Sequence, residues 1–390
     1  MTEKVDGRMI VAALLCMTIG PAIFLLMPIY VGALQSRMAL GEADLGLLAS
    51  ADLIGIALAS FLAPLWINRV PWRLFSAVSF AGLLLCNLLS LTVNEFNLLF
   101  TLRLLAGLCV GGVAAIVAAI FSHARSPDRL FAVAVIMQVT YQSIAFLVLP
   151  DFIETAGLPG FLWSVIVLQA IALAGITWFP RRPLLATASE AGAESNGGNS
   201  HLPAMLILLA MALFFVGQSS LWAFVELIGN GFGLSNTEVG YALAISTFIA
   251  LAGPIWAAIT GERYGRLWPV LIAGIGQILV LTFMDAANSV WLYAAMLTLF
   301  QLFWNMSLGY QFGALVAVDH SNRFVVLVGG AQCMGIAAGP ILGGIAMESY
   351  GNPGLYAVSG AALILFLLAI LPFLRTRAST IIPARVEAPA

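Results

Sequence analysis

The short stretch Asp44-Leu45-Gly46, at the start of a long apolar run, recurs 194 residues later as Glu238-Val239-Gly240, at the start of another. The same offset relates three further groups: Asn68-Arg69 to Glu262-Arg263, Arg129 to Arg323, and Gln138 to Gln332. Four groups in register at one spacing predict an internal repeat, in which the second half of the chain repeats the architecture of the first.

The composition is that of a membrane protein. Hydrophobic residues make up 62% of the 390 residues, and charged residues only 9%. Soluble domains carry about 25% charged residues, because their surfaces face water. A chain this apolar must face lipid over most of its outside. The formal net charge of −2 provides no basic surface that would indicate nucleic acid as a partner.

Twelve apolar runs are long enough to form membrane-spanning helices, each of which needs about 20 apolar residues. They are 9–34, 44–67, 74–93, 97–122, 130–150, 160–179, 203–229, 238–260, 268–286, 290–317, 324–346 and 354–374. Isolated Gly and Pro residues within these runs are compatible with membrane helices. The predicted fold class is therefore an all-α integral membrane protein, with twelve transmembrane helices in two pseudo-symmetric six-helix bundles.

Basic residues predict the orientation, because cytoplasmic loops are enriched in Lys and Arg. Twelve spans place both termini on one side of the membrane. If that side is the cytoplasm, every basic residue except Arg37 and Arg103 lies in a cytoplasmic segment. The stretch 180–202 has the composition of a flexible cytoplasmic linker. It divides an N-terminal bundle (1–179) from a C-terminal bundle with a short tail (203–390). We expect a multi-pass protein of the inner (cytoplasmic) membrane.

The residues Glu-Arg-Tyr-Gly-Arg at 262–266 follow an apolar run and, with Glu262 in place of Asp, resemble the loop signature G-x-x-x-D-R-x-G-R of the major facilitator superfamily. The equivalent loop at 68–73 is degenerate, since Asn68 replaces the acidic residue. The pattern R-x-x-x-G-x-x-x-G at 103–111 is similar to the family's helix-4 motif. The pattern G-x-x-x-G-P-x-x-G-G at 335–344 matches one that the antiporter branch carries in helix 5, but here it lies in helix 11.

This resemblance covers nearly the whole chain and is specific for the superfamily rather than for a subfamily. It implies a secondary transporter that binds a small-molecule substrate and works as a monomer. Because each half holds an even number of spans, the two halves have the same orientation in the membrane. Parallel repeats of this kind rock about a central site near the midplane of the bilayer.

Three charged residues lie well inside apolar runs, where a charge is costly and usually faces a cavity or a partner. Glu226 is the main candidate for a proton carrier, because an apolar setting favours the protonated form of a carboxyl group. Alternatively, Glu226 caps the outer end of its helix. Arg103 is a candidate for binding a substrate anion or for tuning the proton affinity of a nearby acid. The alternative for Arg103 is a structural ion pair with Asp52, which would fix helix 4 against helix 2.

Polar and aromatic residues at helical spacing are candidates for lining a substrate cavity, because amides and aromatic rings suit an amphipathic organic solute. The candidates besides Arg103 are Gln138, Tyr141 and Gln142 on helix 5, Gln218 and Trp222 on helix 7, Gln301 and Asn305 on helix 10, and Gln332 on helix 11. Taken singly, each amide is as readily explained by hydrogen bonding between helices. The repeat symmetry of Gln138 and Gln332 favours the cavity for these two.

Two loops are predicted to form a cytoplasmic gate when that side of the protein closes. The residues are Asn68, Arg69, Glu262, Arg263 and Arg266. The simpler alternative is that these arginines only anchor the protein by their position on the cytoplasmic side. No phosphate-binding loop of the form G-x-x-x-x-G-K-[ST] is present, which argues against direct use of ATP. The three histidines lack metal-site spacing, so we expect no metal, cofactor or enzymatic activity.

Together these features predict a secondary active transporter that moves a small organic solute by alternating access and is coupled to protons through Glu226 or the Asp52–Arg103 pair. One alternative is an uncoupled facilitator, and another is an exporter of drug-like or lipid-like molecules. A more distant alternative is a membrane sensor or enzyme, which would need a soluble domain or catalytic residues gathered on one face.

Overall fold

In the computed structural model, the described residues are 5–184, 201–261, 263, 265–287, 289–319, 324 and 327–374. Within these ranges every regular element is a helix. The N-terminal half holds α1 (Gly7–Ile19), α2 (Ala22–Leu25), α3 (Met27–Met38), α4 (Glu42–Trp66), α5 (Trp72–Ser90), α6 (Phe96–Ser122), α7 (Pro127–Gly175) and η1 (Ile176–Trp178). The C-terminal half holds α8 (Leu202–Gly231), α9 (Asn236–Ile249), α10 (Ala252–Thr260), α11 (Leu267–Phe283), η2 (Met284–Ala286), α12 (Val290–Val318), α13 (Val328–Ile370) and η4 (Leu371–Phe373). Most of the predicted linker lies outside the described residues.

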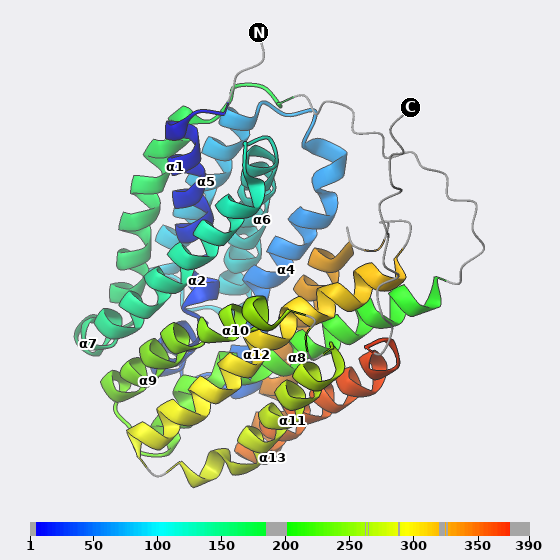
Figure 1. Ribbon diagram of the computed structural model, residues 1–390. Helices are drawn as coiled ribbons and strands as arrows, with labels where there is room; N and C mark the ends of the chain where they lie inside the picture. Colours follow the sequence, from blue (N-terminus) through cyan, green and yellow to red (C-terminus); the bar gives the residue numbers. More distant parts are fainter. Residues whose placement is uncertain are drawn as a thin grey trace, which may run out of the picture.

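Eight helical stretches in the described part of the chain are long and apolar enough to cross a membrane. Two of them, Arg129–Trp178 and Val328–Phe373, are 50 and 46 residues long, whereas one crossing needs about 20. Each of these two turns back at an internal glycine and supplies two crossings (Figure 1). With the broken segment α1–α3 and the 29-residue α12, the described helices provide the twelve crossings that the sequence predicts.

The two turning points have the same backbone conformation. Gly157 has φ 60° and ψ −158°, and Gly351 has φ 65° and ψ −160°. This region of conformational space is open essentially only to glycine. A proline follows two residues later in both cases, at Pro159 and Pro353. The two glycines are separated by 194 residues, so the internal repeat seen in the sequence extends to the backbone.

The first apolar run, predicted as one helix over 9–34, is broken into α1, α2 and α3. Pro21 and Pro28 lack the N–H group that a continuous helix would use, and the helical ladder is interrupted between Ile19 and Met27. Carbonyl groups along this segment instead accept hydrogen bonds from glutamine side chains of other parts of the half. The pairs are Gln138 with Met17, Gln142 with Leu25, and Gln169 with both Ile19 and Gly20.

The two halves meet closely at the ends of the helices that lie away from the termini, called the distal side below. A methyl group on Gly46 of α4 would collide with the carbonyl oxygen of Pro340 on α13. One on Gly240 of α9 would similarly collide with the carbonyl oxygen of Phe146 on α7. Figure 1 shows the two groups of helices converging there and diverging toward the side of the chain termini, called the terminal side below.

Two polar contacts tie the halves together on the distal side. The backbone N–H of Ala43, in the first turn of α4, donates to Glu348 Oε2 on α13 at 2.8 Å. The hydroxyl of Thr237, in the first turn of α9, donates to Asp151 Oδ1 on α7 at 2.6 Å. A carboxylate is favourably placed beside a helix N-terminus, where the helix dipole is positive. Since Ala43 and Thr237 are equivalent in the repeat, the two contacts form a pseudo-symmetric pair.

The helices α4 and α13 also make a described contact on the terminal side. This contact involves a side chain rather than two backbones. The ring of Phe61 lies against Gly330, while 49% of the Phe61 side chain remains exposed. Among the described glycine contacts between the halves, those between backbones lie on the distal side, and the terminal one is made by a ring.

Candidate functional site

The most buried charge in the described part of the chain is Arg103, on α6, whose side chain is 0% exposed. Its Nη1 atom lies 4.0 Å from Oδ2 of Asp52, on α4. Its Nη2 atom donates to Oδ1 of Asn87 at 2.8 Å and to the hydroxyl of Ser90 at 3.0 Å, both on α5. A buried charge is tolerated when it is paired and hydrogen-bonded in this way.

Glycine brings the two partners of this pair together. Gly107 follows Arg103 by one helical turn, and a methyl group on it would collide with the backbone carbonyl of Asp52. Gly111 lies one turn further on and also packs closely against α4, where a methyl group would meet Ile56 and Ala59. The small residues of the R-x-x-x-G-x-x-x-G pattern therefore allow α4 and α6 to approach closely enough for the charges to meet.

The pair is electrostatic rather than hydrogen-bonded. A distance of 4.0 Å between nitrogen and oxygen exceeds that of a hydrogen bond. Nη1 and Nε of Arg103 and Oδ2 of Asp52 are buried and make no hydrogen bond to the described residues. Buried polar atoms without such partners are costly, so this arrangement would be sensitive to small movements of α4 against α6.

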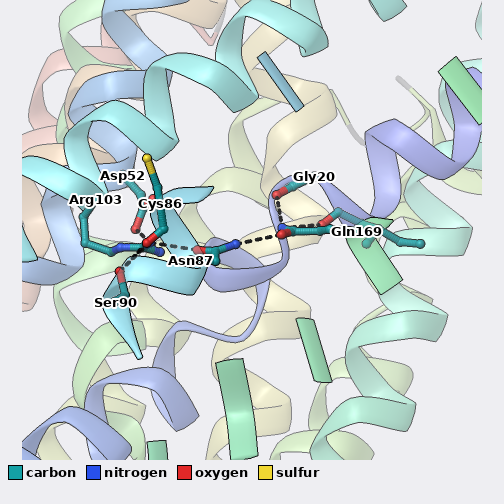
Figure 2. Close-up of polar contacts among 8 residues, drawn as sticks. Gly20, Asp52, Cys86, Asn87, Ser90, Arg103 and Gln169 are labelled. Carbon is teal, nitrogen blue, oxygen red and sulfur yellow. Dashed lines mark hydrogen bonds and ion pairs between the residues drawn. The ribbon is translucent and has the colours of Figure 1, made fainter. Parts of the chain in front are cut away.

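A chain of amide side chains connects this centre to the break after α1. Nδ2 of Asn87 donates to Oε1 of Gln169 at 2.7 Å. Nε2 of Gln169 then donates to the carbonyls of Ile19 and Gly20 at 3.4 and 3.3 Å. Figure 2 shows the continuous row from Arg103 through Asn87 and Gln169 to Gly20. Both amides are fully buried.

Asn87 and Gln169 are absent from the residues that the sequence singles out. The sequence does carry one signal that could have identified them. Each is an amide in an otherwise apolar span, at 74–93 and 160–179 respectively. An amide within a membrane helix is expected to find a polar partner. Its partner could not be identified from sequence, because the two residues are 82 positions apart and lie on different helices.

Glu226 lies on α8, at the boundary between the two halves, and is 5% exposed. Its Oε1 atom is so close to Gly32 of α3 that a methyl group on that glycine would collide with it. Trp222, one turn earlier on α8, packs edge-on against Phe146 of α7, with 6.0 Å between ring centroids. These two α8 residues thus face the N-terminal half, and among the described contacts none joins Glu226 to Asp52 or Arg103.

The amide residues predicted to line a cavity make hydrogen bonds to neighbouring groups. Gln138 and Gln142 donate to carbonyls of the broken first span, and Tyr141 lies half-buried between them in sequence. Gln218 exchanges two hydrogen bonds, at 3.0 and 2.9 Å, with Gln277 of α11. Both of these glutamines are 0% exposed, so their amides satisfy one another inside the C-terminal half.

The remaining cavity candidates lie in α12 and α13. Nε2 of Gln301 donates to the hydroxyl of Ser246 on α9 at 2.8 Å, and Ser246 is the repeat equivalent of Asp52. Asn305 donates to the carbonyl of Gln301 at 2.9 Å. Gln332 is half-buried in α13. The C-terminal half thus places a neutral amide–hydroxyl contact between α9 and α12, the repeat equivalents of α4 and α6, which carry the ion pair in the N-terminal half.

The predicted gate residues differ in how far they are buried. Asn68 and Arg69 are exposed at the terminal end of α4, and Arg263 is exposed beyond α10. Arg266 is 9% exposed, with its guanidinium against Gly313 of α12. Glu262 lies outside the described residues. The structure therefore places Arg266 inside the C-terminal half and the other three described gate residues at the surface.

Comparison with known sequences identifies related proteins. Residues 207–388 match the sequence model of the Major Facilitator Superfamily. The multidrug resistance protein MdtG of Serratia proteamaculans (strain 568) is 28% identical over 170 residues, which cover 42% of this chain and 41% of that protein. The MdtG protein of Enterobacter lignolyticus (strain SCF1) is 27% identical over 175 residues, covering 43% and 41%. The matched region thus spans less than half the length of these relatives.

Solved structures resemble the whole chain in fold. A D-xylose–proton symporter superposes with a TM-score of 0.75 at 14% identity, covering 95% of this chain and 98% of that one. The inward open conformation of the xylose transporter XylE from E. coli gives a TM-score of 0.72 at 14% identity, covering 95% and 97%. A bacterial homolog of the human lysosomal transporter Spinster, in an inward-facing conformation, gives 0.70 at 15%, covering 95% and 96%.

Proposed function

We propose that the chain is a member of the major facilitator superfamily, which the match of residues 207–388 to that family's sequence model supports, and that it is a proton-coupled secondary transporter of a small organic solute. It would work by alternating access, as a monomer in the inner membrane with both termini in the cytoplasm, and without enzymatic activity. The concentration of basic residues on the terminal side supports this orientation. With the distal side closed, the described conformation then corresponds to one that faces the cytoplasm.

The observation that carries the proposal is the position of Glu226 between the halves. Alternating access requires the distal contacts between α3 and α8 to separate. Separation would move the Glu226 carboxyl group from its contact with Gly32 into a hydrated space. Burial favours the neutral form of a carboxyl group and hydration favours the charged form. The same movement that opens the distal side would therefore release a proton from Glu226.

The Asp52–Arg103 pair has a different place in this proposal. Its described contacts all lie within the N-terminal half, so it is not separated when the halves part. We therefore propose that Arg103 holds Asp52 in position. The pair is then a second place, besides Glu226, at which proton binding could be coupled to transport. An organic anion that stabilises the wild type but not Arg103→Ala in a thermal-shift screen would instead make Arg103 a substrate residue.

The test of proton coupling begins with that screen, which uses pooled metabolites, antibiotics and lysolipids to find a ligand. Transport of the ligand is then measured in proteoliposomes. If Glu226 carries the proton, Glu226→Gln abolishes accumulation driven by an imposed proton gradient, while exchange of ligand across the membrane continues. The matched control is Glu154→Gln, an exposed acid just before the distal turn of α7 at Gly157, which should retain both activities.

Two outcomes would contradict the proposal. If wild-type transport is insensitive to the proton gradient, the protein is an uncoupled facilitator. If Glu226→Gln retains driven accumulation, the proton is carried elsewhere.

The direction of transport is a separate question. The similarity to multidrug resistance proteins favours export of an amphipathic molecule. Outward movement of a drug-like ligand in exchange for protons would support export, and inward movement with protons would support uptake.

A further inference from the structure

The row of polar contacts in Figure 2 has a fixed direction, which is set at its Arg103 end. A guanidinium group carries only donors, so Asn87 must turn its carbonyl oxygen toward Nη2 of Arg103, at 2.8 Å. Its Nδ2 atom then donates to Oε1 of Gln169, at 2.7 Å. Gln169 in turn has its Nε2 atom left to donate to the carbonyls of Ile19 and Gly20. The charge of Arg103 therefore determines how each amide in the row is oriented.

The links in this row differ in length. The two that involve Asn87 are short, at 2.8 and 2.7 Å. The two bonds from Gln169 to the first span are 3.4 and 3.3 Å long and lie at the limit of a hydrogen bond. A small movement of the two amides would therefore be felt first where Gln169 meets the first span.

The Arg103 end of the row responds to the charge of Asp52. Nη1 of Arg103 lies 4.0 Å from Oδ2 of Asp52, while Nη2 donates to Asn87 and Ser90. The guanidinium group is thus drawn toward α4 by a charge and toward α5 by two hydrogen bonds. When Asp52 takes up a proton, the charge that draws the group toward α4 is lost, and the balance moves toward α5 and its amide.

The other end of the row meets the span that also contacts Glu226. Ile19 is the last residue of α1, at the break in the first span. Further along the same span, Gly32 of α3 lies directly against Oε1 of Glu226. Since no described contact joins Glu226 to Asp52 or Arg103, the broken first span is an element through which the two places can affect each other.

We propose that Asn87 and Gln169 are positioning residues that transmit the protonation state of Asp52 to the broken first span. Through α3, this span passes the change on to the contact between Gly32 and Glu226. The inference deepens the proposed function and rests on it, because it joins the two places assigned to proton binding. Since coupling between sites is reciprocal, a proton bound at either carboxyl group alters the proton affinity of the other.

The pH dependence expected from this coupling belongs to the two carboxyl groups. Among the described residues, the other ionisable side chains that interact electrostatically with the ion pair are Tyr30 of α3 and Cys86 of α5. The one that interacts with Glu226 is Tyr293 of α12. Phenol and thiol groups ordinarily titrate above about pH 8, so a response in the acidic and neutral range is not theirs.

The test uses the full-length protein with its four cysteines replaced and spin labels at Thr92 and Asn230, exposed distal positions of the two halves. Pulsed electron resonance gives the midpoint pH of distal closure. We expect Asp52→Asn to move this midpoint by about one pH unit, a ten-fold change in proton affinity that is typical of coupled sites. In combination with Gln169→Met, which removes the amide but keeps the length of the side chain, the change should fall to about two-fold or less.

The matched control is Gln277→Met, in the C-terminal half. Gln277 is 0% exposed, as Gln169 is. It also bonds to an amide and to a backbone carbonyl, those of Gln218 and Phe300, but it lies outside the row that begins at Arg103. A loss of buried hydrogen bonds in general would therefore affect both variants. We expect the shift caused by Asp52→Asn to persist in Gln277→Met.

A second measurement is independent of Glu226. Asp52→Asn, Gln169→Met and the double variant are unfolded reversibly, and their effects on the unfolding equilibrium constant are compared. We expect the effect of the double variant to differ about five-fold from the product of the single effects, as for residues in one hydrogen-bond network. If Gln169→Met does not fold, Gln169→Asn takes its place, because the shorter amide reaches Asn87 or the first span but not both.

Three results would overturn the proposal. The first is a midpoint that Asp52→Asn does not shift, and the second is a shift that is the same with and without Gln169→Met, which would show that the charge acts directly across the protein. The third is single effects on unfolding that simply multiply. A wild-type distance that ignores pH contradicts the role of Glu226 instead, and unfolding then decides whether the ion pair and the first span are coupled.

Discussion

At the scale of single residues, the Asp52–Arg103 pair is a buried charge arrangement in which each partner is needed because the other is present. Arg103 has two neutral hydrogen-bond acceptors on α5, and among the described residues one carboxylate forms an ion pair with it. Removing that carboxylate would leave a charge without compensation inside the N-terminal half. Replacing both residues together would leave no uncompensated charge in the interior.

The first prediction follows from this asymmetry. Asp52→Leu alone should lower the free energy of unfolding by about 3 kcal/mol, because Arg103 keeps its charge and loses its partner. The double variant Asp52→Leu, Arg103→Met should remain within about 1 kcal/mol of the wild type. Both values are obtained from reversible unfolding in mixed micelles. A double variant that is less stable than Asp52→Leu would show that the pair stabilises the fold outright.

At the scale of helices, glycine determines which segments can approach. Gly107 permits the contact between α4 and α6, whereas Gly309 on α12 has open space where a side chain would begin. The two positions offer a matched comparison, since both are helical glycines in membrane spans.

The second prediction compares alanine at these two positions. Gly107→Ala should destabilise the protein by about 1–3 kcal/mol, because its methyl group collides with the Asp52 carbonyl and must push the helices apart. Gly309→Ala should be neutral or stabilising, by up to about 1 kcal/mol, because alanine favours the helix more than glycine does. Thermal unfolding in detergent measures both. Equal effects at the two sites would contradict the close packing of α4 and α6.

The sequence predicted the elements better than their interruptions. Hydropathy was sufficient for twelve crossings, because each crossing must be apolar over its whole length. The break in the first span was not predicted, although Pro21 and Pro28 were visible, because membrane helices often contain proline without breaking. The hydrogen bonds that satisfy the broken segment come from Gln138, Gln142 and Gln169, and their helices can be paired only in three dimensions.

The candidate site was predictable in part for the same reason. Asp52, Arg103 and Glu226 are recognisable because charge is rare in a membrane span. The contact between Glu226 and Gly32 was not predictable, since it joins helices from different halves. Assignments of Gln218 and Gln301 to a cavity remain predictions, and the structure gives both amides partners within the C-terminal half.

At the scale of the whole molecule, three of the described contacts between the two halves on the distal side involve a carboxylate. These are the α4–α13 contact with Glu348, the α7–α9 contact with Asp151, and the α3–α8 contact with Glu226. The first two are exposed and contact helix N-termini, where a charged carboxylate is favoured. Only the third is buried, so it is the one at which proton binding and closure should depend on each other.

The most direct test of this account measures the distal opening as a function of pH. Spin labels are placed at Thr92 and Asn230, exposed distal positions of the two halves, after replacement of the four native cysteines. Distances between the labels are then measured by pulsed electron resonance. We predict that the wild type and the control Glu154→Gln close as pH falls, while in Glu226→Gln the distance does not change with pH. A wild-type distance that does not change with pH, or an unchanged pH response in Glu226→Gln, would contradict the assignment of Glu226 as the coupling group.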